Sequence, residues 1–183
     1  EGSNSSSASI VTLINSNQRC PAFRAMSEFW HAGELCDITV KVEGSSFPCH
    51  KLVLASTSSY FRGLLPGDRY ADSHDHELNY MQASTFMHLL TFVYDGECST
   101  AADTLLQLLE AAVCLQVESL QQSVTAALTK SMSDTNCIDL WSVAERAHLG
   151  ERETAAKAHA AAHFEEVAST EAFGERLSRE ILE

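Results

Sequence analysis

The chain has 183 residues, of which 12 are lysine or arginine and 25 are aspartate or glutamate, so its net charge at pH 7 is −13. This charge argues against a nucleic-acid backbone or an anionic membrane as a partner, because both need clusters of lysine and arginine. Hydrophobic residues make up 45% of the sequence, which is enough for a packed core, so the body of the chain is not expected to be disordered.

The charge is distributed unevenly along the chain. Residues 1–62 hold five acidic and five basic residues, residues 63–129 hold nine acidic residues and one basic, and residues 130–183 hold eleven acidic and six basic. A neutral first third followed by an acidic remainder suggests two surfaces with different uses, one that self-associates and one that meets a basic partner. The simpler alternative is that the acidic residues only keep the protein soluble.

Cysteine usage and the N-terminus indicate where the protein resides. The six cysteines are widely spaced with no Cys-x-x-Cys pair, and the serine-rich start lacks the features of a signal peptide. We therefore expect reduced thiols in a protein of the cytoplasm or nucleus. Residues 1–18 are expected to be a disordered tail or tag remnant with a short strand at 10–14. No apolar run approaches the ~20 residues that span a bilayer.

A short aromatic helix is predicted from Pro21 to just before Gly33. Its large apolar residues recur at helical spacing and form one face. So large a face on so short a helix predicts a dimer interface. The alternative is that the helix docks on the chain's own core. The residues of this face are Phe23, Met26, Phe29 and Trp30.

Strands follow the aromatic helix. Residues 37–43 alternate apolar and polar side chains, which predicts a strand, and Gly44-Ser45-Ser46 predicts a turn into a second strand at 47–50. Two short helices are expected next, then a polar loop and a short strand. The two helices are expected at 51–55 and 59–65, the loop at 68–76 and the strand at 77–80.

The rest of the sequence is helical in pattern. A helix from 84 is closed by Asp95-Gly96, and a second, 103–115, has Thr100 or Asp103 as its N-cap. Further helices are expected at 117–131, 135–148, 151–164 and from 172 to the end. The order of elements is α+β rather than alternating βαβ, with a domain boundary near residue 132. Because the last helical pattern has no terminating Gly or Pro, we expect a fragment of a longer protein.

The sequence gives no positive sign of catalysis. Glycine-rich phosphate loops and a G-x-S-x-G element are absent, and Cys49 and His50 would point to opposite faces of a strand. We therefore expect no catalytic residues, no cofactor and no enzymatic activity.

Histidines and one cysteine were the remaining candidates for chemistry. His159 and His163 have the i, i+4 spacing of a chelating pair, but no third ligand is evident, so we expect no metal site and a packed or capping His163. His74 and His76 are expected to be solvated in the acidic loop. Cys98 is the best candidate for an exposed thiol, and its acidic neighbours should raise its pKa.

Five blocks of the sequence resemble the BTB/POZ domain in their order and spacing over about 100 residues. They are LCDITV at 35–40, FPCHKLVLA at 47–55, SSYF at 58–61, LLTFVYDG at 89–96 and LLEAA at 108–112. The resemblance implies a BTB/POZ fold, a small sheet surrounded by helices, over residues 19–132. Asp37 and His50 match residues that are structural in that family.

The helical remainder resembles the start of a BACK domain, as in kelch-like proteins. The likeness lies in TNCI at 135–138, AE at 144–145 and HFEEV at 163–167, although Asp134 stands where relatives usually have proline. Residues 133–183 would then be the truncated, all-α N-terminal part of that domain, called the 3-box region.

The resemblance to kelch-like proteins implies a function. It implies a homodimer whose first helix packs against its partner, and a substrate adaptor that recruits the N-terminal domain of cullin-3 to a ubiquitin ligase. Substrate would bind a downstream domain that this chain lacks. Tyr70 and Asp72 occupy the place of a hydrophobic-x-Glu motif in cullin-binding relatives, with an acid one methylene shorter. The other residues that the resemblance places at the cullin interface are Tyr94, Met132, Ile138 and Phe164.

Two alternatives to a cullin adaptor remain. One is a dimeric scaffold, cytoskeletal or transcriptional, that does not engage cullin. The other is a redox or electrophile sensor, which would need a thiol in a basic pocket, and only Cys20, beside Arg19, has a basic residue within three positions. For Tyr94, half-burial at a helix end is a structural alternative to contact with cullin.

Overall fold

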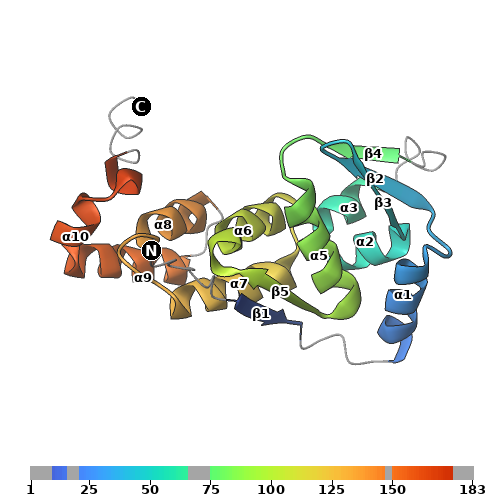
Figure 1. Cartoon of the computed structure of the whole chain (residues 1–183), viewed down its shortest axis with the longest axis horizontal. Helices are drawn as coiled ribbons and strands as arrows, with labels where there is room; N and C mark the ends of the chain where they lie inside the picture. Colours follow the sequence, from blue (N-terminus) through green and yellow to red (C-terminus); the bar gives the residue numbers. More distant parts are fainter. Residues whose placement is uncertain (1–9, 16–20, 66–74, 147–149, 175–183) are drawn as a thin grey trace, which may run out of the picture. The chain divides into compact units, whose positions relative to one another are not determined.

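The computed structural model describes residues 10–15, 21–65, 75–146 and 150–174 (Figure 1). It divides into two compact units, residues 1–124 and residues 125–183. The division falls inside helix α7 (Glu118–Lys130), close to the predicted domain boundary at residue 132, which stays a prediction. None of the helices in the four described ranges combines the length and the apolarity that crossing a bilayer requires.

A two-stranded antiparallel pair joins segments far apart in the first unit. β1 (Ile10–Ile14), a strand that the sequence predicted, pairs with β5 (Glu97–Ala101), placing Ile10 opposite Ala101 and Ile14 opposite Glu97. The hydroxyls of Thr12 and Ser99 lie 3.1 Å apart across the pair. β5 was not predicted, because its sequence ECSTA has little apolar alternation and its pairing partner lies far away in the chain.

The helix predicted from about residue 103 forms, but its start differs from the prediction. The chain first makes a 3₁₀ turn, Ala102–Thr104, and only then α6 (Leu105–Cys114). Neither predicted N-cap residue holds that position, since Thr100 belongs to β5 and Asp103 to the 3₁₀ turn. Thr104 precedes α6, but its hydroxyl donates to Asp103 Oδ1 at 3.2 Å instead of capping the helix.

A three-stranded sheet has the order β3-β2-β4. β2 (Ile38–Val42) runs antiparallel to β3 (Ser45–Cys49) and parallel to β4 (Asp75–Leu78). The hairpin turn is formed by Glu43 and Gly44, one residue earlier than predicted. Their φ angles of 48° and 76° are both left-handed, which matches the twist of the flanking strands. β4 begins earlier than expected, so His76 lies on a strand and not in a loop.

Helix α5 (Ala83–Asp95) is the centre of the first unit. It packs against β5, α6, α1 (Pro21–Ala32) and α2 (Lys51–Thr57), and α2 also packs against α3 (Ser59–Leu64), as Figure 1 shows. Seven of its 13 residues are buried, and the helix ends at Gly96 with φ 79°. The buried residues are Thr85, Phe86, Leu89, Leu90, Phe92, Val93 and Tyr94.

The second unit is all-helical in its described part. Its helices after α7 are α8 (Cys137–Arg146), α9 (Gly150–Ala162) and α10 (Phe164–Ala168), and α8 packs along α9. A small core of Cys137, Ile138, Ala160 and Val167 holds them together. Partly buried apolar side chains around this core are Met132, Trp141, Ala172 and Phe173.

Candidate functional site

The predicted interface helix α1 is only partly covered by its own chain. All 12 of its residues are described and none is buried. Phe23, Met26 and Trp30 are half-buried, and Phe29 is 37% exposed. The indole of Trp30 stacks on Tyr94 of α5 with ring centroids 4.6 Å apart, and its Nε1 donates to the carbonyl of Pro48 at 3.2 Å. One side of the helix therefore docks on its own core while apolar surface remains open.

Further apolar side chains are exposed on other elements of the first unit. Ile10 is 77% exposed and Ile14 58% on β1, Leu35 is 74% exposed after α1, and Leu52 is 69% exposed on α2. Where such side chains lie together on one face, they are typical of a surface that another protein covers.

Tyr94 is enclosed by the first unit and is only 2% exposed. Its hydroxyl accepts a hydrogen bond from the backbone N–H of His50 at 2.8 Å and lies 3.1 Å from that residue's Nδ1. Burial is the main cause that raises the pKa of the phenol. These contacts favour the structural alternative for Tyr94, and its contact with cullin stays a prediction.

Asp37 and His50 fix the junction between β3 and α2. Oδ1 of Asp37 accepts a hydrogen bond from the backbone N–H of Lys51 at 2.7 Å, in the first turn of α2. Nε2 of His50 lies 2.9 Å from the carbonyl of Glu34 and 3.8 Å from Sγ of Cys36. Both side chains hold backbone in place, in agreement with the structural roles expected for them.

Of the other predicted cullin-binding residues, Met132 and Ile138 lie together in the second unit. Tyr70 and Asp72 lie outside the described residues. Ile138 is 1% exposed in the small core of the second unit, and Met132 packs partly buried against it. Phe164 is 58% exposed at the start of α10, with its ring edge-on to Phe173 at 5.8 Å.

The prediction of an exposed Cys98 was wrong. Its pairing with Leu13 across β1 and β5 leaves it 3% exposed, and burial, aided by the Asp95 carboxylate, raises its thiol pKa to about 11. Burial also raises the thiol pKa of Cys36, Cys49 and Cys137. Cys114, at the end of α6, is the exposed cysteine within the described ranges. Raised pKa values at four thiols give no support to a redox sensor.

His76 is half-buried and not solvated as expected. Its Nε2 lies 3.2 Å from the hydroxyl of Tyr60, and its ring is edge-on to Phe61 at 5.9 Å. Burial lowers the pKa of this imidazole, since the charged form loses hydration.

The second unit brings together three possible metal ligands. His159 on α9 and His163 just after it face Asp134, which precedes α8, and one ligand atom from each lies within 4.8 Å of the others. The expectation that no third ligand exists was wrong, because Asp134 is 25 residues from His159 and helical spacing could not reveal it. His163 is exposed and turned toward Asp134 instead of capping α10.

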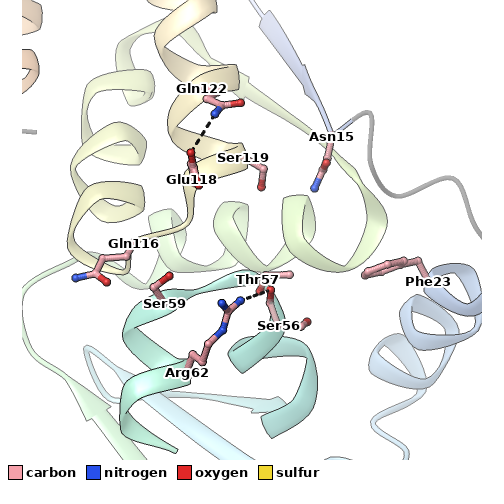
Figure 2. A pocket seen from close by; sticks show the side chains of 10 residues that line it. All are labelled: Asn15, Phe23, Ser56, Thr57, Ser59, Arg62, Gln116, Glu118, Ser119 and Gln122. Atoms are coloured by element: carbon pink, nitrogen blue, oxygen red, sulfur yellow. Dashed lines mark hydrogen bonds between the residues drawn. The ribbon is translucent and has the colours of Figure 1, made fainter. Parts of the chain in front are cut away.

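A hollow of about 480 Å³ lies in the first unit beside α1, α2 and α3 (Figure 2). Three of its polar side chains are already engaged: Arg62 donates to the carbonyls of Ala55 and Ser56, and the amide of Gln122 donates to Glu118. Neither histidine nor cysteine is among its ten described lining residues. They are Asn15, Phe23, Ser56, Thr57, Ser59, Arg62, Gln116, Glu118, Ser119 and Gln122.

Comparison with known families matches residues 26–132 to the BTB/POZ domain. The chain belongs to the BTB/POZ family. The match covers most of α1, the three-stranded sheet, the central helix α5 and α7. A BACK domain after it stays a prediction.

Curated relatives of this BTB/POZ chain carry kelch names. It is 32% identical over 170 residues, or 92% of its length, to the human Kelch repeat and BTB domain-containing protein 2, and 30% identical over 142 residues, or 77%, to the human Kelch-like protein 26. It spans only 27% and 23% of these two relatives. Among solved structures, the BTB domain of zebrafish PATZ1 matches with a TM-score of 0.53 and 23% identity, covering 60% of this chain and 89% of that one, which supports the fold alone.

Proposed function

We propose that this chain is the dimerising and cullin-3-binding part of a substrate adaptor for a ubiquitin ligase, with no catalysis of its own. The observation that carries the proposal is the BTB/POZ match over residues 26–132 together with relatives that bear kelch names. The substrate would bind another part of the longer protein, because the chain corresponds to about a quarter of those relatives. The site of action would be the cytoplasm or the nucleus.

The open apolar face of α1 supports a homodimer. Burying Phe29 and other exposed side chains such as Leu52 against a second copy would remove apolar area from water, at about 25 cal/mol per Å². Residues 1–62 carry no net charge, so two copies could approach through this part without strong repulsion.

Charge supports a basic partner for the rest of the chain. Residues 63–183 hold 20 acidic and seven basic residues, so a complementary surface on cullin-3 would be basic and binding would weaken as salt screens the attraction. Tyr70, Asp72 and the exposed Phe164 are the residues best suited to direct contact in this proposal. The buried Tyr94 and Ile138 would act by supporting the surface.

The dimer is tested by the mass of the chain in light scattering. A homodimer has twice the 20.0 kDa of one chain. Phe29→Glu places a charge in the proposed interface and should yield monomer, whereas Met87→Glu, at a residue 43% exposed on α5, should leave the dimer intact. A wild-type mass of one chain would contradict the dimer.

Cullin binding is tested by titrating the chain with the cullin-3 N-terminal domain. The wild type should bind, and Phe164→Ala should weaken binding while Met87→Ala does not. No binding up to about 50 μM, an affinity near −6 kcal/mol, would contradict the proposal.

A dimeric scaffold that does not engage cullin is the second candidate. The observation in its favour is Tyr70-Ala71-Asp72, which departs from the hydrophobic-x-Glu motif expected of cullin-binding relatives. Tyr70→Ala with Asp72→Arg separates the two functions, since an adaptor would lose cullin from immunoprecipitates and a scaffold would have none to lose.

A further inference from the structure

The cluster of Asp134, His159 and His163 offers ligands of the kind that bind zinc. Nε2 of His159 lies 2.9 Å from Oδ1 of Asp134, and Nδ1 of His163 lies 3.6 Å from the same oxygen. Zinc bonds of 2.0–2.1 Å in tetrahedral geometry place neighbouring ligand atoms about 3.3 Å apart. Two of the three ligand distances already lie near that value, and the third is at most 4.8 Å.

The fold brings the two imidazoles to one side of the helix. His159 and His163 are four residues apart, and the backbone N–H of His163 donates to the carbonyl of His159 at 3.1 Å, so helical geometry holds them in succession. Their rings stack with centroids 4.6 Å apart and an angle of 17°. Small side-chain rotations would therefore direct one nitrogen of each ring at a shared ion.

The backbone that carries Asp134 is fixed by hydrogen bonds. The side chain of Asn136 accepts from the N–H of Ser133 at 2.9 Å and donates to the carbonyl of Ser131 at 3.0 Å. Cys137 and Ile138 of the core follow directly, and Ala160 of the same core adjoins His159. The three ligands thus stand on a short, packed framework, which metal affinity requires.

The surroundings suit a cation that arrives from solvent. The side chains of His159, Asp134 and His163 are 24%, 36% and 49% exposed, so an ion has access and water can complete its coordination. Lys157, the cation two residues before His159, is engaged by Glu153 at 2.5 Å and lies over the ring of Trp141 at 5.1 Å.

We propose that Asp134, His159 and His163 form a binding site for a divalent transition-metal ion of the zinc class, with water in the remaining position. Two imidazoles and a carboxylate are borderline ligands that suit zinc and its neighbours better than magnesium or calcium. Bound metal would link the start of α8 to the end of α9. Neither the BTB/POZ match nor the proposed adaptor function assigns a metal here.

Calorimetric titration with Zn²⁺ tests the site. The whole chain, free of any histidine tag and treated with chelator, should bind one ion. Asp134→Asn keeps an oxygen that can accept the hydrogen bond of His159 but removes the charged ligand, and it should weaken binding at least about tenfold, as should His163→Gln. The matched control is His31→Gln, which removes the imidazole of another His–Asp pair and should leave the affinity unchanged.

A second measurement separates this site from thiol binding. Co²⁺ bound by imidazole and carboxylate gives a visible absorption spectrum without the intense near-ultraviolet band of thiolate ligands. Circular dichroism of each variant checks that it is folded. Three results would overturn the proposal: no Zn²⁺ binding by the wild type, unchanged affinity in Asp134→Asn and His163→Gln, or loss of binding in Cys114→Ser.

Discussion

Each unit contains a histidine paired with an aspartate, and the two pairs are completed in different ways. In the first unit, Nε2 of His31 lies 3.0 and 3.1 Å from the two oxygens of Asp95, and the hydroxyl of Ser27 donates to the same carboxylate at 2.5 Å. In the second unit, a second imidazole, that of His163, takes the place of the serine. A hydroxyl donor satisfies the carboxylate, whereas another imidazole adds a ligand.

The two units also differ in how extensive their buried apolar cores are. In the first, α5 alone buries seven residues, three of them aromatic, whereas no aromatic side chain is buried in the described part of the second, where α9 buries only Ala156 and Ala160. Small cores are often supplemented by a structural metal. The unit with the less extensive apolar packing is therefore also the one in which a bound ion would contribute most to stability.

The largest effect is expected from Phe86→Ala. Phe86 is fully buried on α5, with its ring edge-on to Phe47 at 5.2 Å. Truncation should lower the free energy of unfolding of the first unit by about 3–5 kcal/mol, through lost burial and a residual cavity. Denaturant unfolding followed by far-UV circular dichroism measures it. Met87→Ala on the same helix should change it by less than about 0.5 kcal/mol, and equal losses in the two variants would contradict the assigned core.

Ile138→Ala should have a smaller effect, confined to the second unit. We expect a loss of about 2 kcal/mol, the low end for such a truncation, because several of the side chains packed around Ile138 are only partly buried. Hydrogen exchange measured by mass spectrometry should show faster exchange in α8 and α9 and no change in α5. If Zn²⁺ slows exchange in the variant, that result supports the metal site in the second unit. Accelerated exchange in α5 would show that the units are not independent.

Tyr94→Phe should cost about 1–3 kcal/mol, the range for leaving a buried partner unsatisfied. The ring stack with Trp30 is retained, but the N–H of His50 loses its acceptor. Denaturant unfolding gives the difference. Tyr80→Phe is the control, since Tyr80 is 52% exposed and water can take the place of its hydroxyl beside Tyr60, to which it is hydrogen-bonded. If Tyr94→Phe is as stable as the wild type but binds cullin less well, the direct-contact role of Tyr94 gains support over the structural one.

The smallest effect concerns His76 and pH. Burial lowers its pKa in the folded state, so the unfolded chain takes up the proton more readily once the pH falls below about 6.5. The free energy of unfolding should therefore decline as the pH falls from about 6.5 to the lowered folded-state pKa. His76→Gln removes this contribution, so the variant should lose less stability than the wild type between pH 7.5 and 5.5. Equal losses would show that His76 is not desolvated.

Local sequence patterns predicted the elements whose causes are local. The aromatic spacing of α1, the alternation of β2 and the glycine at the end of α5 each appear within a few residues, and each element forms where expected. β5 was missed because its strand character comes from pairing with β1. The burial of Cys98 follows from that same pairing.

The candidate sites divide in the same way. The spacing of His159 and His163 predicted a pair, but Asp134 joins them only through the packing of α8 on α9. The cullin-binding residues came from family resemblance, which says where a motif lies and not how exposed each side chain is. The burial of Tyr94 and Ile138 depends on α1 and α9, which are distant in sequence.

The two tryptophans of the chain fall one in each unit, and this gives each unit its own fluorophore. Trp30 is stacked on Tyr94 and has the imidazole of His31 at 4.8 Å, so its emission should respond to changes around α1. Trp141, beneath the ammonium of Lys157, reports on α8 and α9. Replacing either tryptophan by phenylalanine would leave a single-emitter protein in which self-association and events at the helical unit can be followed separately by light alone.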